Sequence, residues 1–84
     1  MAHQAQGSRK QLLAVRKRLA GNLRSQRQRL GFSQERAAEK AGFSLQYYQR
    51  IERCIVNVPL DTITKFAMAF GVDPAELLEA PDGQ

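Results

Sequence analysis

The chain has 84 residues, enough for one compact domain, and a formal net charge of +5. Its single cysteine, Cys54, excludes an internal disulfide and a cysteine metal cluster, and its single histidine, His3, lies near one end of the chain. Because no apolar run reaches the length of a membrane span and no secretory signal pattern is present, we expect an intracellular protein without a membrane partner.

The charges are segregated along the chain. No acidic residue precedes Glu35, and after Gly71 no basic residue follows. The basic residues of the first third are Arg9, Lys10, Arg16, Lys17, Arg18, Arg24, Arg27 and Arg29. Since a solvated surface usually mixes both signs, this polarity indicates that the basic end meets a polyanion. Nucleic acid is the leading candidate because neutralised phosphates release counterions, and acidic lipid or an acidic protein is the alternative.

The first third of the chain predicts a polar leader and a helix. Residues 1–8 have no apolar period, and we expect them to be disordered. The following leucines fall on one face of a helix that ends at Gly31. They are Leu12, Leu19, Leu23 and Leu30. Residues 9–18 form either the beginning of this helix or a loose basic arm, since Gly21-Asn22 is a point at which the two could separate.

Two short helices are expected next. Ser33 is a good N-cap for a helix over 34–41, whose inner face carries alanines and which ends at Gly42. Ser44 caps a helix over 45–53 in the same way. A three-residue turn that contains glycine sets two such helices at a steep angle, although an ordinary helical hairpin would show the same turn.

The last third predicts a loop over 54–58 and two more helices. Pro59 suits the first turn of a helix whose core-facing stripe ends at Gly71. That stripe consists of Leu60, Ile63, Phe66, Ala67 and Phe70. Asp73, Pro74 and Glu76 form a capping box that begins a fifth helix. No segment alternates with period two, so the fold class is all-α, with a domain over 19–80 and a tail over 81–84.

These motifs together resemble the lambda-repressor-like helix-turn-helix family, which includes phage repressor, Cro and the XRE-type regulators. The resemblance spans about residues 19–78. It rests on Arg27, Gly31-Phe32-Ser33-Gln34-Glu35, Ala38-Glu39-Lys40-Ala41-Gly42, Ile51-Glu52-Arg53, Asn57, Leu60, Ile63, Lys65-Phe66-Ala67, Phe70-Gly71-Val72 and Leu77-Leu78. It implies a five-helix DNA-binding domain in which the helix over 45–53 enters the major groove.

The resemblance also implies roles for side chains. The base-reading positions are Leu45, Gln46, Gln49 and Arg50. The DNA-backbone positions are Gln34, Ser44, Tyr47 and Arg53, and the structural ion pair is Arg27 with Glu52. The chemistry agrees in part, because glutamine pairs with adenine, arginine pairs with guanine, and a helix N-terminus favours phosphate. Against these roles, any surface helix needs a solvated polar face.

Two inward positions depart from the family pattern. Ala37 replaces the usual leucine, and Tyr48 replaces a β-branched aliphatic residue. We expect the Tyr48 ring to fill the space left at Ala37, with its hydroxyl at the surface or on a backbone carbonyl. Cys54 replaces the usual glycine, which requires either a changed loop or backbone strain. We interpret Cys54 as a small buried apolar residue, and a redox-sensing thiol as the alternative.

The loop over 54–58 is unusually apolar for a surface segment. Together with an outward methionine it predicts a patch that a partner would cover. Its residues are Ile55, Val56, Val58 and Met68. We expect a homodimer whose recognition helices lie about 34 Å apart on a near-palindromic site, unless these residues are needed in the core.

The leading hypothesis is therefore a cytoplasmic, nucleoid-associated transcriptional regulator that binds double-stranded DNA sequence-specifically. The alternative is a protein-interaction module, such as an antitoxin-like protein or coregulator, that keeps the fold without base reading. An enzyme is not supported, because the chain lacks a usable histidine, a paired-carboxylate site and a phosphate-cradling loop. We expect no metal, no cofactor and no small-molecule ligand.

Overall fold

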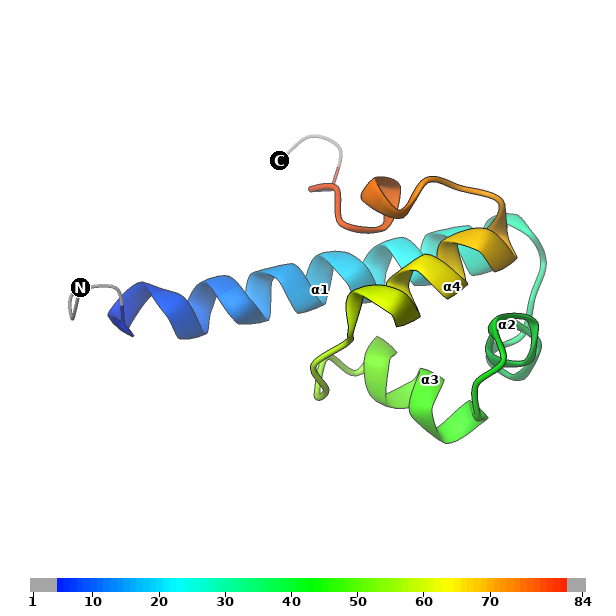
Figure 1. Ribbon diagram of the computed structural model, residues 1–84, viewed down its shortest axis with the longest axis horizontal. Helices are drawn as coiled ribbons and strands as arrows, with labels where there is room; N and C mark the ends of the chain where they lie inside the picture. The colour runs from blue at the N-terminus through cyan, green and yellow to red at the C-terminus, as the bar shows by residue number, and fades with distance from the viewer. Residues whose placement is uncertain (1–4, 82–84) are drawn as a thin grey trace.

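The computed structural model describes residues 5–81, which form four α-helices and one short 3-10 helix (Figure 1). The elements in chain order are α1 (Ala5–Arg29), α2 (Gln34–Ala41), α3 (Leu45–Glu52), α4 (Leu60–Phe70) and η2 (Pro74–Leu77). The described residues contain no strand, which confirms the all-α prediction. Within the same residues, no helix is both long enough and apolar enough to cross a membrane.

The expected fifth helix is the four-residue 3-10 helix η2, so the all-α fold has four α-helices rather than five. The predicted capping box is present, because Asp73 accepts from the Ala75 N–H and the Glu76 carboxylate accepts from the Asp73 N–H. The Leu78 N–H then closes on the Ala75 carbonyl at 3.0 Å, three residues back, and this tighter turn ends the element.

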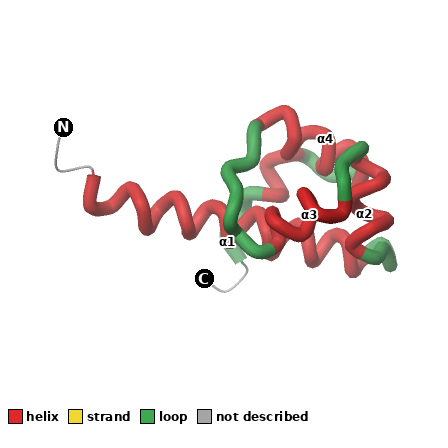
Figure 2. The backbone as a smooth tube through the Cα atoms, turned by 90° about the horizontal axis from the view of Figure 1, so that it is seen from below, coloured by secondary structure: helices red, strands yellow, loops and turns green. Residues whose placement is uncertain are grey.

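Helix α1 is one continuous helix through Gly21 and Asn22, so residues 9–18 are helical rather than a loose arm. It begins at Ala5, and residues 5–8, which were expected to belong to the disordered leader, are helical. Residues 1–4 of that leader and residues 82–84 of the tail lie outside the described residues. The N-terminal half of α1 projects from the body (Figures 1 and 2), which leaves Leu12 60% exposed.

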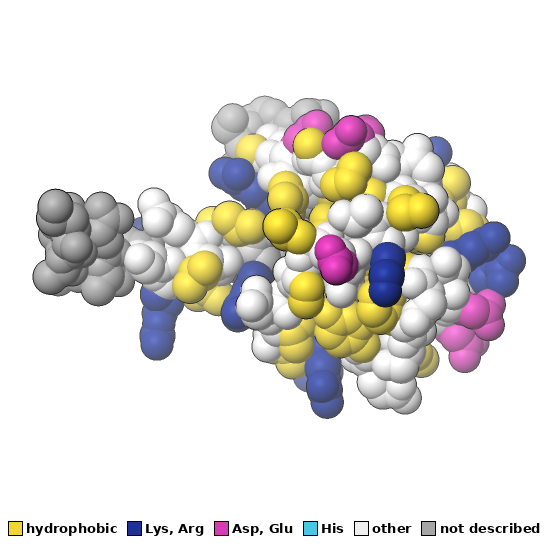
Figure 3. Space-filling model, in the orientation of Figure 1, with side chains coloured by type: hydrophobic (Ala, Val, Ile, Leu, Met, Phe, Trp, Pro, Cys, Tyr) yellow, Lys and Arg dark blue, Asp and Glu magenta, His cyan; other side chains and the backbone are white. Residues whose placement is uncertain are grey.

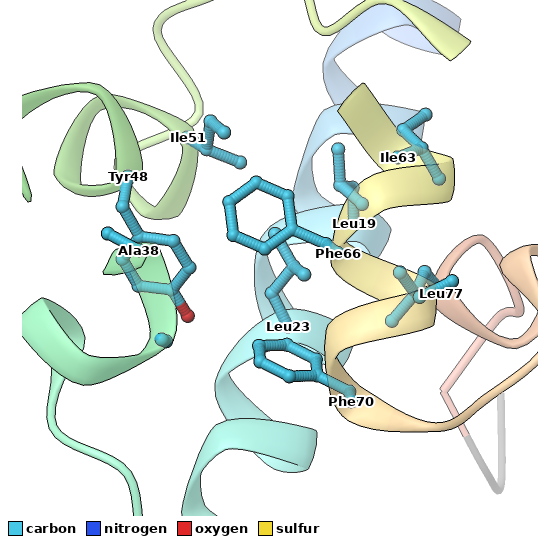
Figure 4. Packing of buried hydrophobic residues seen from close by; sticks show 11 residues of the cluster. Leu19, Leu23, Ala38, Tyr48, Ile51, Ile63, Phe66, Phe70 and Leu77 are labelled. Carbon is cyan, nitrogen blue, oxygen red and sulfur yellow. The ribbon is translucent and has the colours of Figure 1, made fainter. Parts of the chain in front are cut away.

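The core is built around Phe66 of α4, between α1 and α3 (Figure 4). The Phe66 ring lies 5.2 Å from that of Phe43 and 5.5 Å from that of Tyr48, centroid to centroid. Leu60, expected in the same stripe, is 75% exposed. The buried residues of α4, from Thr62 to Phe70, lie on one face of the helix. At 3.6 residues per turn, Leu60 falls at the edge of that face.

Ala37 and Tyr48 both point into this core, as predicted, and both are fully buried. The prediction for the Tyr48 hydroxyl was wrong, because this group is buried and makes no hydrogen bond of good geometry. Burial raises the pKa of Tyr48, and the nearby Glu52 carboxylate raises it further. The tyrosine therefore stays protonated and acts mainly through its ring.

Cys54 keeps the left-handed backbone of a helix-ending glycine, with a φ of 64°. This conformation costs a residue with a β-carbon about 1–2 kcal/mol. Of the two expected outcomes, strain is therefore the one that occurs, and the thiol is half-buried beside the Arg16 carbonyl, with its Sγ 3.9 Å away.

A pair of variants at Tyr48 tests this description of the core. Tyr48→Phe keeps the ring and removes a buried hydroxyl without a good partner, so its free energy of unfolding is expected to equal or exceed that of the wild type. Tyr48→Ala leaves a cavity and is expected to lose about 3–5 kcal/mol. Urea denaturation measures both. A loss above about 1 kcal/mol in Tyr48→Phe would mean that the hydroxyl makes a stabilising hydrogen bond after all.

Candidate nucleic-acid interface

The turn that joins α2 to α3 begins at a glycine in the left-handed backbone conformation. Gly42 has a φ of 85°, and its N–H closes on the carbonyls of Ala38 and Glu39. The next N–H, that of Phe43, donates to Ala38 at 2.9 Å, so the last carbonyls of α2 are satisfied by the turn itself. Ser44 then caps α3, which lies at the outer edge of the molecule (Figure 1).

The outer face of α3 presents two long polar side chains. Gln46 and Arg50 are exposed, and neither side chain makes a hydrogen bond or ion pair with another residue of the described part. Leu45, at the beginning of the helix, is half-buried. Of the predicted base-reading residues, Gln46 and Arg50 are thus the ones whose polar groups are available to a ligand.

Gln49, the remaining predicted base-reading residue, is turned toward α2. Its Nε2 donates to Oε1 of Gln34 at 3.2 Å, and Nε2 of Gln34 in turn donates to Glu52 at 3.0 Å. Both glutamines are half-buried. The Gln34 side chain therefore links α2 to α3 internally, and only its second amide hydrogen is left for an external acceptor.

Glu52 is the centre of a charged cluster between α1, α2 and α3, and only 8% of its surface is exposed. Its Oε2 accepts from Nε of Arg27 at 3.0 Å, while its Oε1 accepts from Gln34 and lies 3.6 Å from Nε of Arg24. Arg27 also donates to the Phe32 carbonyl at 3.1 Å. The structure thus brings Arg27 and Glu52 together and adds Arg24 and Gln34, two partners that the sequence reasoning missed.

The charge state of Glu52 follows from these partners. Burial alone would raise the pKa of its carboxyl group, but the hydrogen bonds from Gln34 and Arg27 and the charge of Arg27 outweigh this effect and lower the pKa below its ordinary value of 4.5. The carboxylate is therefore ionised at neutral pH and holds the two arginines by charge. Arg24 in addition donates to the backbone carbonyl of Glu52 at 3.3 Å, where the end of α3 favours a cation.

The predicted backbone-contacting residues lie around the same helix. Ser44 accepts from the Tyr47 N–H at 3.1 Å, which commits its oxygen to the cap and leaves its hydroxyl hydrogen free to donate. The Tyr47 ring is half-buried against that of Phe43, with 5.3 Å between centroids. Arg53 is exposed just after the helix.

The predicted dimer residues divide into two groups. Val56 and Val58 are half-buried and pack against the core. Ile55 and Met68 are 57% and 76% exposed, and Leu60, which the sequence placed in the core, is exposed between them in the chain. Figure 3 shows that apolar side chains are also exposed along the projecting half of α1, where Leu13 and Val15 are more than 40% exposed. The molecule therefore carries more exposed apolar surface than the sequence predicted.

Within residues 5–81, no three histidine, cysteine, aspartate or glutamate side chains lie together in a way that could hold a metal ion.

Comparison with known proteins identifies relatives with the same arrangement. The helix-turn-helix family model matches residues 23–77. A hypothetical transcription factor from Neisseria meningitidis is 40% identical over 63 residues, which are 75% of this chain and 59% of the relative. The chain thus spans less than two thirds of that relative's length.

Two solved structures are also similar. The hypothetical transcription factor NHTF from Neisseria superposes with a TM-score of 0.78 at 39% identity, covering 80% of this chain and 77% of that one. The restriction-modification controller protein C.AhdI from Aeromonas hydrophila gives a TM-score of 0.72 at 35% identity, covering 77% of this chain and 94% of the controller.

Glu52→Gln tests the role of the charged cluster. The amide keeps the shape but leaves Arg27 without its carboxylate, so the free energy of unfolding at pH 7 is expected to fall by about 2 kcal/mol. Glu39→Gln, which removes an exposed ion pair with Arg36, is the control and is expected to change it by less than about 0.5 kcal/mol. Thermal or urea denaturation measures both variants.

The stability difference between wild type and Glu52→Gln is expected to depend on pH. Because the pKa of Glu52 is lower in the folded than in the unfolded chain, its contribution is present above pH 4.5 and is lost as the pH falls through the folded value. The stability difference between wild type and Glu52→Gln should therefore shrink in acid. A difference that stays constant down to about pH 2 would contradict the assigned charge.

Proposed function

Because the chain belongs to the helix-turn-helix family, we propose that it is a DNA-binding transcriptional regulator whose helix α3 enters the major groove. The relatives named as transcription factors and as a restriction-modification controller support a regulatory role. We place its action in the cytoplasm, on nucleoid DNA.

The observation that carries the proposal is the outer face of α3. Gln46 and Arg50 are exposed there with unpartnered polar groups, four positions apart and therefore on the same side of the helix. Arginine can donate two hydrogen bonds to guanine, and glutamine can exchange two with adenine. Leu45 at the beginning of the helix offers an apolar contact to a thymine methyl. Gln49 contributes less, because its amide already binds Gln34.

Groups around α3 are suited to hold the phosphate backbone on either side of the groove. The second amide hydrogen of Gln34, the hydroxyl groups of Ser44 and Tyr47 and the guanidinium of Arg53 are the proposed contacts. Gln34 also opens α2, where unpaired N–H groups favour an anion. Such contacts fix the register of the helix without reading sequence.

We further propose that the regulator acts as a homodimer through the apolar surface that follows α3. Ile55 of the loop and Met68 of α4 are its exposed members, Val56 and Val58 are half-buried in the loop, and the exposed Leu60 joins the set. Several exposed apolar side chains on so small a domain favour coverage by a partner. A two-fold dimer would place two copies of α3 about one helical turn of DNA apart, on a near-palindromic site.

Selection of bound duplexes from random DNA, followed by single substitutions, tests base reading. Arg50→Ala and Gln46→Ala are each expected to weaken the selected site by about 1–3 kcal/mol per half-site and to relax preference at one base pair. Binding of random duplex should change much less. The control is Arg18→Ala, an exposed arginine on α1 that leaves α3 intact.

The outcomes of this experiment separate the two function classes. Equal weakening of all sequences by Arg50→Ala would move Arg50 from the bases to a phosphate. Failure to enrich any site would overturn the proposal and favour the protein-interaction module.

Sedimentation equilibrium tests the dimer. Ile55→Glu and Met68→Glu place charge on exposed apolar positions, so each should leave the melting temperature nearly unchanged and shift the protein from dimer to monomer. Ser25→Glu, an added charge on the exposed side of α1, should leave the dimer intact. A wild-type protein that sediments as a monomer at micromolar concentration would refute this part of the proposal.

A further inference from the structure

The projecting half of α1 is strongly basic. It carries five basic residues and no acidic one. They are Arg9, Lys10, Arg16, Lys17 and Arg18. The ion pairs found within residues 5–81 involve other arginines, so the charge of this segment is not compensated within the domain. Positive charge that is not paired within the domain attracts a negatively charged partner.

Two of the five residues lie on the side of α1 that faces α3. At 3.6 residues per turn, positions 9, 16 and 27 return to within about 20° of the same direction. Arg27 points to α3, because it binds Glu52 at 3.0 Å. The carbonyl of Arg16 lies 3.9 Å from Sγ of Cys54, the second residue after α3. Arg9 and Arg16 therefore extend the α3 side of the molecule beyond the end of α3.

The views of the whole molecule agree with this placement. Figure 1 shows α3 below α1, with the projecting half of α1 continuing past it. Figure 3, in the same orientation, shows Lys and Arg side chains standing out below the projecting helix, toward the side on which α3 lies. Basic groups of α1 and the outer face of α3 are thus offered to the same partner.

We propose that Arg9 and Arg16 bind phosphates of the DNA backbone next to the bases that α3 reads. This inference rests on the proposed function. The two arginines lie about 10 Å apart along the helix axis, so they reach separate phosphates. Because α1 is a continuous helix, they are held in place before DNA binds, and the planar guanidinium group suits a phosphate better than a lysine ammonium does.

A second copy of the chain is a less suitable occupant for this stripe. Two chains that met through Arg9 and Arg16 would oppose like charges, which is unfavourable where water is excluded. Leu12 and Val15 line a groove with Arg16, Val58 and Leu78, so a protein contact over this groove would compete with DNA for Arg16 and not for Arg9.

Salt-dependent binding of the full chain to the selected duplex tests the inference with two double variants. Arg9→Gln with Arg16→Gln removes the stripe. Lys10→Gln with Arg18→Gln removes the same charge from other sides of α1, about 100° and 180° around the helix from Arg9. The slope of log Kobs against log salt should fall by about 0.9 for each lost phosphate contact, hence by nearly 2 per chain in the first variant. The control variant should lose much less.

The outcomes separate this inference from the proposed function. Equal slopes for the two double variants would show that these charges act only through the overall electrostatic potential of the protein. The inference would then be overturned, while the proposed function as a DNA-binding regulator would stand. A change of sedimenting mass in the first variant, with the wild-type slope, would overturn it in favour of a contact between copies. If the wild type selects no site and shows no salt-dependent binding, the proposed function and the inference fail together. Circular-dichroism melting of each variant verifies that α1 stays folded.

Discussion

The buried carboxylate of Glu52 is the constraint on which the helix-turn-helix depends. A buried carboxylate is costly unless its oxygens accept hydrogen bonds and its charge is paired. Here Arg27 of α1 and Gln34 of α2 donate to the two oxygens of Glu52, and Arg24 of α1 lies close enough to add a second positive charge. These bonds are made only at one angle between the three helices. The direction in which α3 presents Gln46 and Arg50 is therefore fixed by a polar cluster and by the Phe66-centred core together.

Local signals in the sequence predicted most of the fold because they act over a few residues. The serine caps of α2 and α3, the glycine that ends α2 and the Asp73 capping box all appear where the sequence placed them. The inward positions of Ala37 and Tyr48 could also be predicted, since a volume lost at one site and gained at another suggests compensation. The Arg27–Glu52 pair came from family resemblance, because residues 25 positions apart leave no local pattern.

The errors came from tertiary structure that spacing does not encode. Leu60 fits the apolar spacing of α4, but it lies at the edge of the helix face that packs against the core. Leu12 fits the leucine stripe of α1, but no other element within residues 5–81 covers the projecting half of that helix. The engagement of Gln34 and Gln49 with each other depends on how closely α2 and α3 approach, and no sequence signal distinguishes a glutamine that binds a neighbour from one left for DNA.

The most direct measurement of the central claim is a titration of the selected duplex into ¹⁵N-labelled protein, observed at the side chains by NMR. If α3 reads bases while Glu52 holds it in place, the Gln46 amide and the Arg50 Nε–H resonances shift and broaden on binding, and the Arg27 Nε–H resonance keeps its position. A shift at Arg27 with Arg50 unchanged would contradict the account, because it would mean that the cluster opens toward DNA and that the outer face of α3 does not bind.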